Sequence, residues 1–410
     1  MPDSIGENRS ERTTTGVLPA LWAFAFVSYL LRTNVAVAQQ YMGRELSLSD
    51  IQIGYVFSAF LVGYTIFQLP AGVLGDKFGP RAVLGASALI CGAATLGTGL
   101  LPGLLLKGTV VALASLLVVR FVLGLGQAAT YPVAMRAVGD WFPSSRHAFI
   151  NSLIFTGSTL GAAFAPPLVA YIMKAFGWRA TFYWTGITPI LLAAVWWQQT
   201  RGPRYNRVSA ERTAGRARWW TLLSQKNVLI LCVSYFLYCY AISIFVYWLF
   251  KYLVQVRHLS IVNSGWANSL PWIAATIVVP ILGRWTDRIS RLRGALNGRR
   301  VIATSCLTIS AVLVFVGAGA QNIAVALAAI TLSVSLLFST EAPYWSTAIR
   351  LAKGDAGTAG GLMNLAGNLG GVVSTTLVPV LASLFGWFNA LLSGSACALG
   401  ATMFWFLIRE

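Results

Sequence analysis

The chain has 410 residues, of which 57% are hydrophobic and 10% are charged, and its formal net charge is +18 at pH 7. Soluble domains contain roughly 25% charged residues, so this composition excludes a protein whose main solvent is water. The five cysteines lie in apolar stretches without the spacing of metal ligands or of extracellular disulfides, and we assign them to packing: Cys91, Cys232, Cys239, Cys306 and Cys397.

Apolar stretches of about twenty residues recur along the chain, and each can cross the roughly 30 Å hydrocarbon core of a bilayer as an α-helix. The pattern predicts an all-α polytopic membrane protein with twelve transmembrane helices. The predicted spans lie near 17–39, 51–73, 82–101, 109–135, 148–172, 180–198, 226–255, 262–284, 300–319, 323–349, 357–384 and 387–408. The first span lacks a small-residue cleavage site, so we expect an uncleaved anchor.

The basic residues gather on one side of the predicted membrane. Of the 30 Lys and Arg residues, six arginines lie in 201–218 and six more in 284–300. The positive-inside rule then places both termini and the long central loop in the cytoplasm. We therefore expect a multi-pass protein of the cell inner membrane, in contact with anionic lipid and without a nucleic-acid partner.

The hydrophilic stretch 199–225 is the longest interruption of the apolar pattern, and it divides the chain into two halves. The predicted parts are a cytoplasmic N-terminal tail (1–16), an N-terminal six-helix half (17–198), a cytoplasmic linker (199–225) and a C-terminal six-helix half (226–408).

Two sequence features repeat across this linker. The segment Gly72–Arg81, which we expect to form a loop, has a Gly-to-Asp interval of four that recurs in Gly283–Arg288 at an offset of 211 residues, and Gly161 recurs as Gly370 at an offset of 209. Two pairs at nearly one offset indicate an internal duplication. Parallel repeats of six spans predict the major facilitator fold, in which the substrate site lies between the halves at the membrane midplane.

Small and charged residues near the helix ends are candidates for a conformational switch. Glycines spaced four apart, as at Gly157 and Gly161, let helices approach closely where they slide, and static packing is the alternative. Asp76 and Asp287 adjoin cytoplasmic arginines and are expected to form charge contacts that change between inward-facing and outward-facing states, with solvated loops as the alternative. The switch candidates are Gly72, Asp76, Lys77, Arg81, Asp287 and Arg288.

Three charged residues lie deep within predicted spans: Arg32, Arg120 and Glu341. Each costs roughly 2.5–3.5 kcal/mol at the bilayer centre, so each is a functional candidate. Two arginines and one carboxylate leave a net positive charge, which suits an anionic ligand because arginine presents a planar fork and stays protonated. We expect Arg32 and Arg120 to contact the ligand, and structural pairing is the alternative.

Helical spacing gives these charges polar neighbours. Arg120, Gly124, Gln127 and Tyr131 share one face of the fourth span, and similar pairs occur on the first, second and eleventh spans. Hydrogen bonds between helices are an equal alternative to ligand contact for the tyrosines and amides. The substrate-binding candidates are Tyr29, Arg32, Tyr64, Gln68, Arg120, Gln127, Trp345, Asn364 and Asn368.

Glu341 has two interpretations. It is the one deep carboxylate that could carry a coupling proton, or an arginine partner holds it ionised. His147 and His258 lie in predicted loops and are not convincing proton carriers.

Enzyme activity is not expected. The chain has no phosphate-binding Gly-rich loop, no metal-ligand cluster and no nucleophile with a plausible base, so we expect no cofactor and no metal. The prediction is a monomeric secondary transporter that imports a small organic anion by alternating access, together with a proton, another cation or none. The alternatives are a drug or metabolite exporter, a neutral-solute carrier and a membrane sensor.

Several segments resemble the anion:cation symporters of the major facilitator superfamily, which include carriers of galactonate, hexuronates, glucarate and phthalate, and the sialin-type transporters. The likeness covers nearly the whole chain. The segments that carry it are Tyr29–Arg32, Gly54–Arg81, Arg120–Pro132, Asp140–Arg146, Gly177–Arg179 and Asn364–Asn368.

The resemblance implies a carboxylate-bearing substrate, with Tyr29 and Arg32 at the site and Tyr64 facing it. It also implies that Arg120 shapes the site and that Asn364 binds substrate hydroxyls. Proton-coupled members of the family typically have an aspartate just before the first-span arginine and a glutamate in the fourth span. Leu31 and Gln127 stand at these positions here, so coupling through them is not expected.

Overall fold

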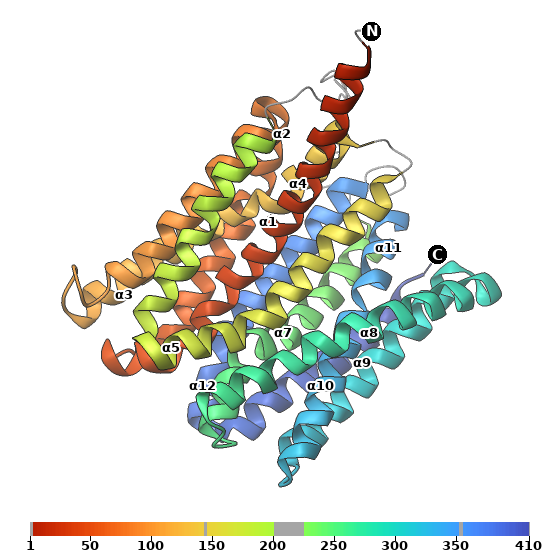
Figure 1. Ribbon diagram of the computed structural model, residues 1–410. Coiled ribbons are helices and arrows are strands. Elements are labelled where there is room, and N and C mark those ends of the chain that lie inside the picture. Colours follow the sequence, from red (N-terminus) through yellow and green to blue (C-terminus); the bar gives the residue numbers. More distant parts are fainter. Residues whose placement is uncertain (1–2, 143–145, 201–224, 352–355, 410) are drawn as a thin grey trace. The chain divides into compact units, whose positions relative to one another are not determined.

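The computed structural model describes residues 3–142, 146–200, 225–351 and 356–409, and every named element in these ranges is an α-helix (Figure 1). The helices are α1 (Asp3–Glu45), α2 (Asp50–Leu100), α3 (Thr109–Ala128), α4 (Thr130–Trp141), α5 (His147–Gln199), α7 (Lys226–Gln255), α8 (Ile261–Arg293), α9 (Ala295–Gly319), α10 (Ile323–Ser339), α11 (Glu341–Leu351) and α12 (Ala356–Leu407). Most of the predicted linker, with its six arginines, lies outside the described residues.

Within the described ranges, nine helices or helix pairs are long and apolar enough to cross a membrane. Three of the nine, α2, α5 and α12, break at Gly79, Gly177 and Gly386, where φ is 79°, 82° and 80°. L-residues with a side chain rarely adopt this conformation, so glycine allows one helix to turn directly into the next. Each of the three therefore supplies two of the twelve predicted spans, and the all-α polytopic prediction is confirmed. The segment Gly72–Arg81, which we expected to be a loop, is helical up to this break.

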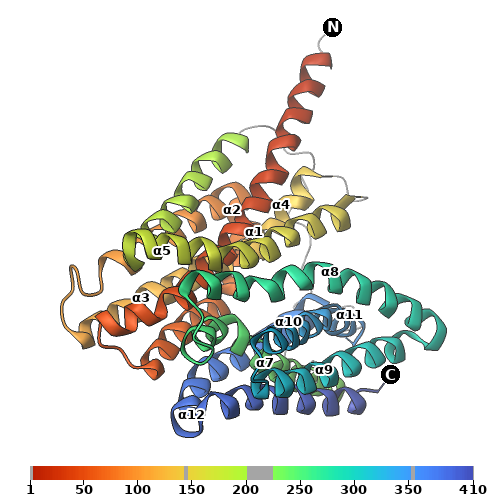
Figure 2. The ribbon, with the colours of Figure 1, turned by 60° about the horizontal axis from the view of Figure 1, so that its bottom comes forward.

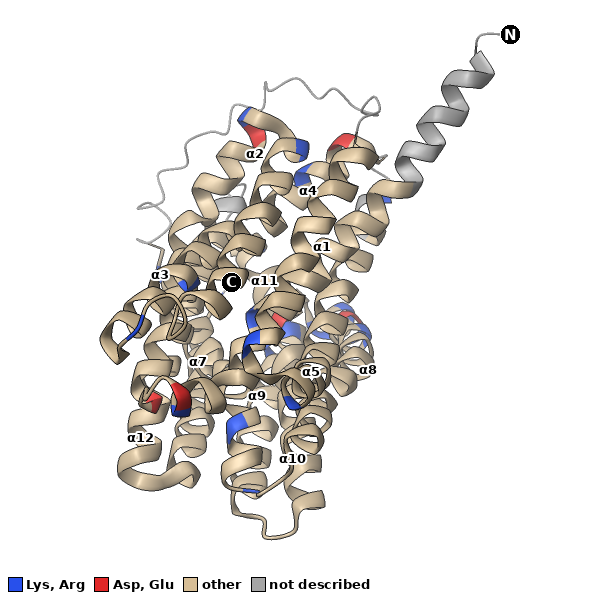
Figure 3. Ribbon diagram, turned by 60° about the vertical axis from the view of Figure 1, so that its left-hand side comes forward, with Lys and Arg blue, Asp and Glu red and all other residues tan. Residues whose placement is uncertain are grey.

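The described helices carry few charges along their length (Figure 3). Contacts divide them into two units, and the first unit holds α1, α3, α4, α5 and α2 from Ala59 onward. α1 packs along α5 so closely that a Cβ on Gly161 would lie 2.3 Å from the carbonyl oxygen of Phe26. Glycine is required there because any side chain would force the two backbones apart.

The second unit holds α7 to α12 and the first turns of α2, Ser49–Ser58. α7 packs along α12, where a Cβ on Gly370 would lie 2.1 Å from the carbonyl oxygen of Phe236, and α8, α9 and α10 pack against one another (Figure 2). Asp50 at the start of α2 forms an ion pair with Lys251 of α7, whose side chain is 4% exposed. The contact of Gly161 with Phe26 in the first unit thus has a counterpart at Gly370 and Phe236.

Two membrane spans are interrupted by a short break before a proline. The α3 to α4 break falls at Ala129, three residues before Pro132, and the α10 to α11 break falls at Thr340, three residues before Pro343. Proline has no N–H to donate to the preceding turn, which favours an interruption there. Both pairs are separated by 211 residues, which adds to the repeat. The second break places Glu341 in the first turn of a new helix.

Candidate functional site

Arg32 of α1 lies among three aromatic rings in the first unit. Its Cζ is 5.1 Å from the ring centroid of Tyr29, 5.1 Å from that of Phe60 and 4.9 Å from that of Tyr64. Guanidinium groups at this distance are attracted to ring faces, and more strongly where water is excluded. We call Tyr29, Arg32, Phe60 and Tyr64 the Arg32 cage. Within the cage, Arg32 is half-buried, and Phe60 and Tyr64 are buried.

Arg120 of α3 lies behind this cage and is fully buried. Its two terminal nitrogens donate hydrogen bonds to the carbonyl oxygens of Leu31 and Arg32, each at 3.4 Å, and its Cζ is 5.5 Å from the Phe60 ring. Arg120 therefore holds the main chain at Arg32, and Phe60 contacts both guanidinium groups. Two cations around one ring give this region a positive potential.

Gln127 and Tyr131 continue the polar face of α3 and α4 and bond to neighbouring helices. Gln127 Nε2 donates to the carbonyl oxygen of Ser28 at 2.9 Å, and the Ser28 hydroxyl donates back to Gln127 Oε1 at 3.3 Å. The Tyr131 hydroxyl lies 2.6 Å from that of Ser158. Gln68, one turn beyond Tyr64, is half-buried. These bonds join α3 and α4 to α1 and α5. Gln127 and Tyr131 therefore form hydrogen bonds between helices, which were the alternative to ligand contact.

In the second unit, Glu341 is surrounded by hydrogen-bond donors. Tyr235 donates to its carboxylate at 3.2 and 3.1 Å, Tyr238 donates to Oε1 at 3.1 Å, and the Trp345 indole donates to Oε2 at 3.0 Å. We call these four residues the Glu341 cluster. Among the described residues of this unit, no lysine or arginine lies within ion-pair distance of Glu341. The cluster therefore solvates the carboxylate with neutral donors.

Asn364 and Asn368 lie next to this cluster on α12. Asn368 Nδ2 donates to the carbonyl oxygen of Asn364 at 2.9 Å, and both side chains are half-buried. Gly367, in the turn between them, approaches Tyr235 so closely that a Cβ would lie 2.5 Å from its ring. The structure thus brings the predicted Trp345 and the two asparagines to the surroundings of Glu341.

Sequence reasoning missed Phe60, Tyr235 and Tyr238. An aromatic ring in an apolar span carries no polar signal, and α7 has several tyrosines with no pattern that singles out two. The four-residue spacing from Phe60 to Tyr64 was the available clue, since it places both on one helix face.

The switch candidates of the first unit form specific contacts. Asp76 pairs with Arg136 of α4, whose Nε lies 3.2 Å from Asp140. Arg81 donates from Nη2 to the carbonyl oxygen of Trp197 at 3.3 Å. Lys77 is exposed, and Gly72 is half-buried. The predicted segment Asp140–Arg146 is described only as far as Phe142 and at Arg146.

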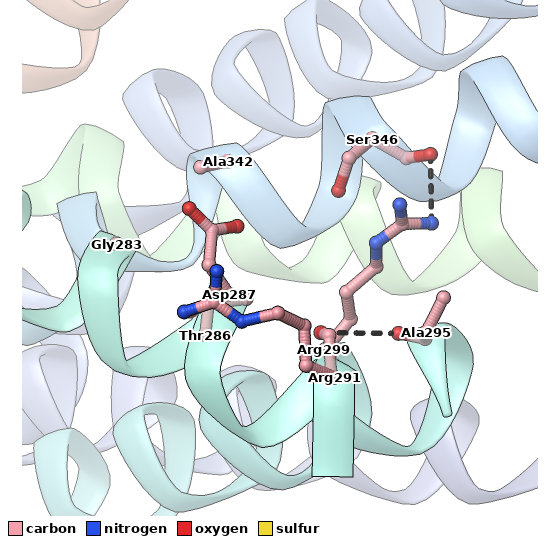
Figure 4. Close-up of a pocket in the computed structure, with 9 residues that line it drawn as sticks. Gly283, Thr286, Asp287, Arg291, Ala295, Arg299, Ala342 and Ser346 are labelled. Carbon is pink, nitrogen blue, oxygen red and sulfur yellow. Dashed lines mark hydrogen bonds between the residues drawn. The ribbon is translucent and has the colours of Figure 1, made fainter. Parts of the chain in front are cut away.

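Asp287, the counterpart of Asp76 in the second unit, borders an open groove. Asp287 and Arg291 project from the same face of α8 into a groove of about 570 Å³, and Arg299 of α9 donates to the carbonyl oxygen of Ser346 at 3.0 Å (Figure 4). Arg288 is exposed. The two copies of the segment therefore differ, because Asp76 has an arginine partner on α4 and Asp287 lies on a groove wall.

Comparison with known proteins identifies relatives along almost the whole chain. A probable sulfoacetate transporter of Cupriavidus necator is 31% identical over 412 residues, which cover 95% of this chain and 93% of the relative. The hexuronate transporter of Bacillus subtilis is 28% identical over 388 residues, which cover 91% and 89%. Both relatives are transporters of organic anions by name, as the resemblance around Arg32 and Arg120 implies.

A solved structure supports the fold independently. A bacterial homologue of the human lysosomal transporter Spinster, in an inward-facing and occupied conformation, has a TM-score of 0.81 at 16% identity and covers 96% of both chains. The sequence model of the family described as Major Facilitator Superfamily matches residues 21–375 of this chain. These matches confirm the resemblance, and the chain therefore belongs to the major facilitator superfamily and is a transporter, not an enzyme.

Proposed function

We propose that this transporter imports a small organic anion, a sugar acid or another carboxylate or sulfonate, across the inner membrane by alternating access. The observation that carries the proposal is the Arg32 cage. Aromatic rings hold the guanidinium in place and leave it charged, so its N–H edge is preorganised for a planar or tetrahedral anionic group. The names of the relatives agree with this ligand class.

Each site residue has a proposed role that follows from its contacts. Arg32 binds the anion, and Tyr29, Phe60 and Tyr64 fix the orientation of its guanidinium. Arg120 is a positioning residue, because it holds the main chain at Arg32 and is itself fully buried.

The amides supply hydrogen bonds to the rest of the ligand in this proposal, and Trp345, whose indole N–H donates to Glu341, contacts the ligand through its ring. Gln68 lies one turn from Tyr64 on the same helix, and Asn364, Asn368 and Trp345 lie near one another in the second unit. Gln127 supports α1 through Ser28. The orientation of the chain in the membrane follows from the positive-inside distribution, which supports cytoplasmic termini.

Ligand-induced stabilisation of the purified protein tests this function. Sulfoacetate, D-glucuronate, D-galactonate and D-glucarate are compared with glucose and galactose as neutral counterparts. An acid at a hundred times its Kd should stabilise the protein by about 2.7 kcal/mol, and the neutral sugars should not. The variant Arg32→Gln should lose this stabilisation. Arg44→Gln should keep it, because Arg44 is an exposed residue of the same helix.

Other outcomes favour other carriers. Equal stabilisation by neutral sugars would indicate a neutral-solute carrier, and stabilisation only by amphipathic drugs would indicate an exporter. Full acid-dependent stabilisation of Arg32→Gln would contradict the assignment of the anion site to the cage.

A further inference from the structure

The Glu341 cluster holds a carboxylate within a membrane span, and no basic partner for it occurs among the described residues of its unit. Of the 12 acidic residues in the chain, Glu341 is the only one away from tails, loops and span ends. Its side chain sits in the first turn of α11, and its partners come from α7 and from one turn further along α11. A charged group at this depth is costly, so the arrangement requires a functional reason.

The donors around Glu341 permit two charge states. A tyrosine hydroxyl both donates and accepts, so Tyr235 or Tyr238 can turn to accept a hydrogen bond from a protonated carboxyl. The Trp345 indole can only donate, and it needs one carboxyl oxygen in either state. A fixed arginine partner would instead hold the carboxylate ionised throughout.

In the described part of this unit, no fixed charge lies within ion-pair distance of Glu341 to decide between these states. Within the described residues, α10 and α12 contain no Asp, Glu, Lys, Arg, His or Tyr. Four titratable groups interact electrostatically with Glu341: Tyr235, Tyr238 and Cys239 on α7, and Tyr344 on α11. The charged groups on the neighbouring helices include Arg350 on α11, Arg299 on α9, and Asp287 and Arg291 on α8 across the groove. Of these, Arg299 donates to the Ser346 carbonyl. Glu341 itself accepts hydrogen bonds from the two tyrosines and the indole.

The geometry favours a proton over a metal cation. Both carboxylate oxygens already accept O–H or N–H donors, whose hydrogens point toward the place that a metal ion would occupy. A sodium or calcium ion needs several oxygen ligands. The described residues contain no group of three or more His, Cys, Asp or Glu that could hold a metal. One side of the cluster is not covered by the protein, because Trp345 is 39% exposed.

We propose that Glu341 carries the proton in a proton-coupled uptake of the organic anion. A proton from the outer solution binds the carboxylate to give a neutral carboxyl group, which donates to a tyrosine oxygen, and the proton leaves to the inner solution as the carboxylate forms again. One proton then accompanies each monovalent anion, so the cycle moves no net charge. This inference rests on the proposed function.

Reconstituted full-length protein tests the inference with labelled D-glucuronate and sulfoacetate. Three quantities are measured: exchange without a gradient, accumulation when the outside is one pH unit more acidic, and proton entry from an entrapped dye. The wild type should exchange the anion, accumulate glucuronate about tenfold and take up protons, since one pH unit corresponds to a tenfold ratio for one coupled proton. Glu341→Gln should keep exchange but lose both accumulation and proton entry.

Tyr238→Phe provides a second test that keeps the carboxylate. Removal of one donor should move the pH dependence of exchange to higher pH, because the ionised form loses a hydrogen bond. Tyr240→Phe is its matched control on α7, since that hydroxyl bonds Ser393 instead, and it should leave the profile unchanged.

The outcomes separate this inference from the proposed function. Gradient-driven accumulation by Glu341→Gln would overturn the inference, as would a wild type that exchanges the anion without any proton entry. If Glu341→Gln does not fold, an unchanged pH profile in Tyr238→Phe overturns it. Absence of exchange of either probe in the wild type would instead contradict the proposed function.

Discussion

The two deep arginines of the first unit have different proposed roles: Arg32 binds the anion, and Arg120 holds the main chain at Arg32. Arg32 is half-buried with its guanidinium among aromatic rings, whereas Arg120 is fully buried and donates to the carbonyl oxygens beside Arg32. Both stay protonated at any relevant pH. Their depth alone predicted that both matter, but only the contacts distinguish the residue proposed to meet the ligand from the one behind it.

Phe60 has no polar atom in its side chain, yet its substitution should weaken anion binding. Phe60→Leu removes the ring that contacts both guanidinium groups, and the Kd should rise about tenfold, the equivalent of about 1.4 kcal/mol. Titration calorimetry with the best stabilising acid measures the change.

Phe182→Leu is the control for Phe60→Leu. Phe182 is equally buried in the same unit and packs on Trp178, so its loss should lower stability without changing the Kd. Equal affinities for Phe60→Leu and the wild type would contradict a role of the ring in holding Arg32.

Much of the site could be predicted from residue types, but its partners could not. Charged and amide residues in apolar spans are conspicuous, so the sequence singles out Arg32, Arg120, Gln127 and Glu341 as candidates. Tyr235 and Tyr238 were not, because their choice depends on how α7 packs against α11. The sequence also left open whether Glu341 has an arginine partner, which is a question of tertiary contact.

At the level of the helices, apolar stretches of about twenty residues predicted nearly all of the spans. The joins were less predictable: the segment Gly72–Arg81 reads as a loop, but the helix continues to a single glycine at Gly79. The breaks at Ala129 and Thr340 fall inside predicted spans. A proline three residues later interrupts the hydrogen bonds of the helix, but the stretch around it stays apolar enough to be predicted as one span.

Close helix contact should make the pair α7 and α12 sensitive to one methyl group. Gly370→Ala places a Cβ about 2 Å from the Phe236 carbonyl, so the helices must separate, and stability should fall by about 1–3 kcal/mol. Gly361→Ala on the same helix has no atom within 4 Å of the added Cβ and should be neutral or slightly stabilising. Thermal unfolding in detergent compares the two, and equal stability would exclude the close contact.

Across the whole molecule, the scaffold is duplicated and the charges are not. Applying the 210-residue separation of Phe26 and Phe236 to Arg32 gives Ile242, and applying the 211-residue separation of the proline pair to Glu341 gives Thr130. The helix contacts and proline breaks are thus common to both units. The cation and the carboxylate each belong to one unit, which divides proposed anion binding from proposed proton binding.

The orientation of the whole chain predicts which helix ends are accessible from outside. A cysteine at Leu104, which is 50% exposed, should react with an impermeant maleimide on intact cells. A cysteine at Lys77, at the end of the first span of α2 and just before the break at Gly79, should react only after the membrane is opened.

The background of this labelling is low, because the native cysteines are buried or half-buried. The opposite labelling pattern would reverse the proposed topology.

The glycine turns also determine what the outer surface offers to other molecules. With the proposed topology, the outer connections are 46–49, 101–108, the turn at Gly177, 256–260, 320–322 and the turn at Gly386, and the longest of them is 101–108. An antibody or a protease usually recognises an extended loop. A binder directed at this face would therefore have to recognise helix ends or the single segment 101–108. Tags for purification or imaging are best inserted in that segment.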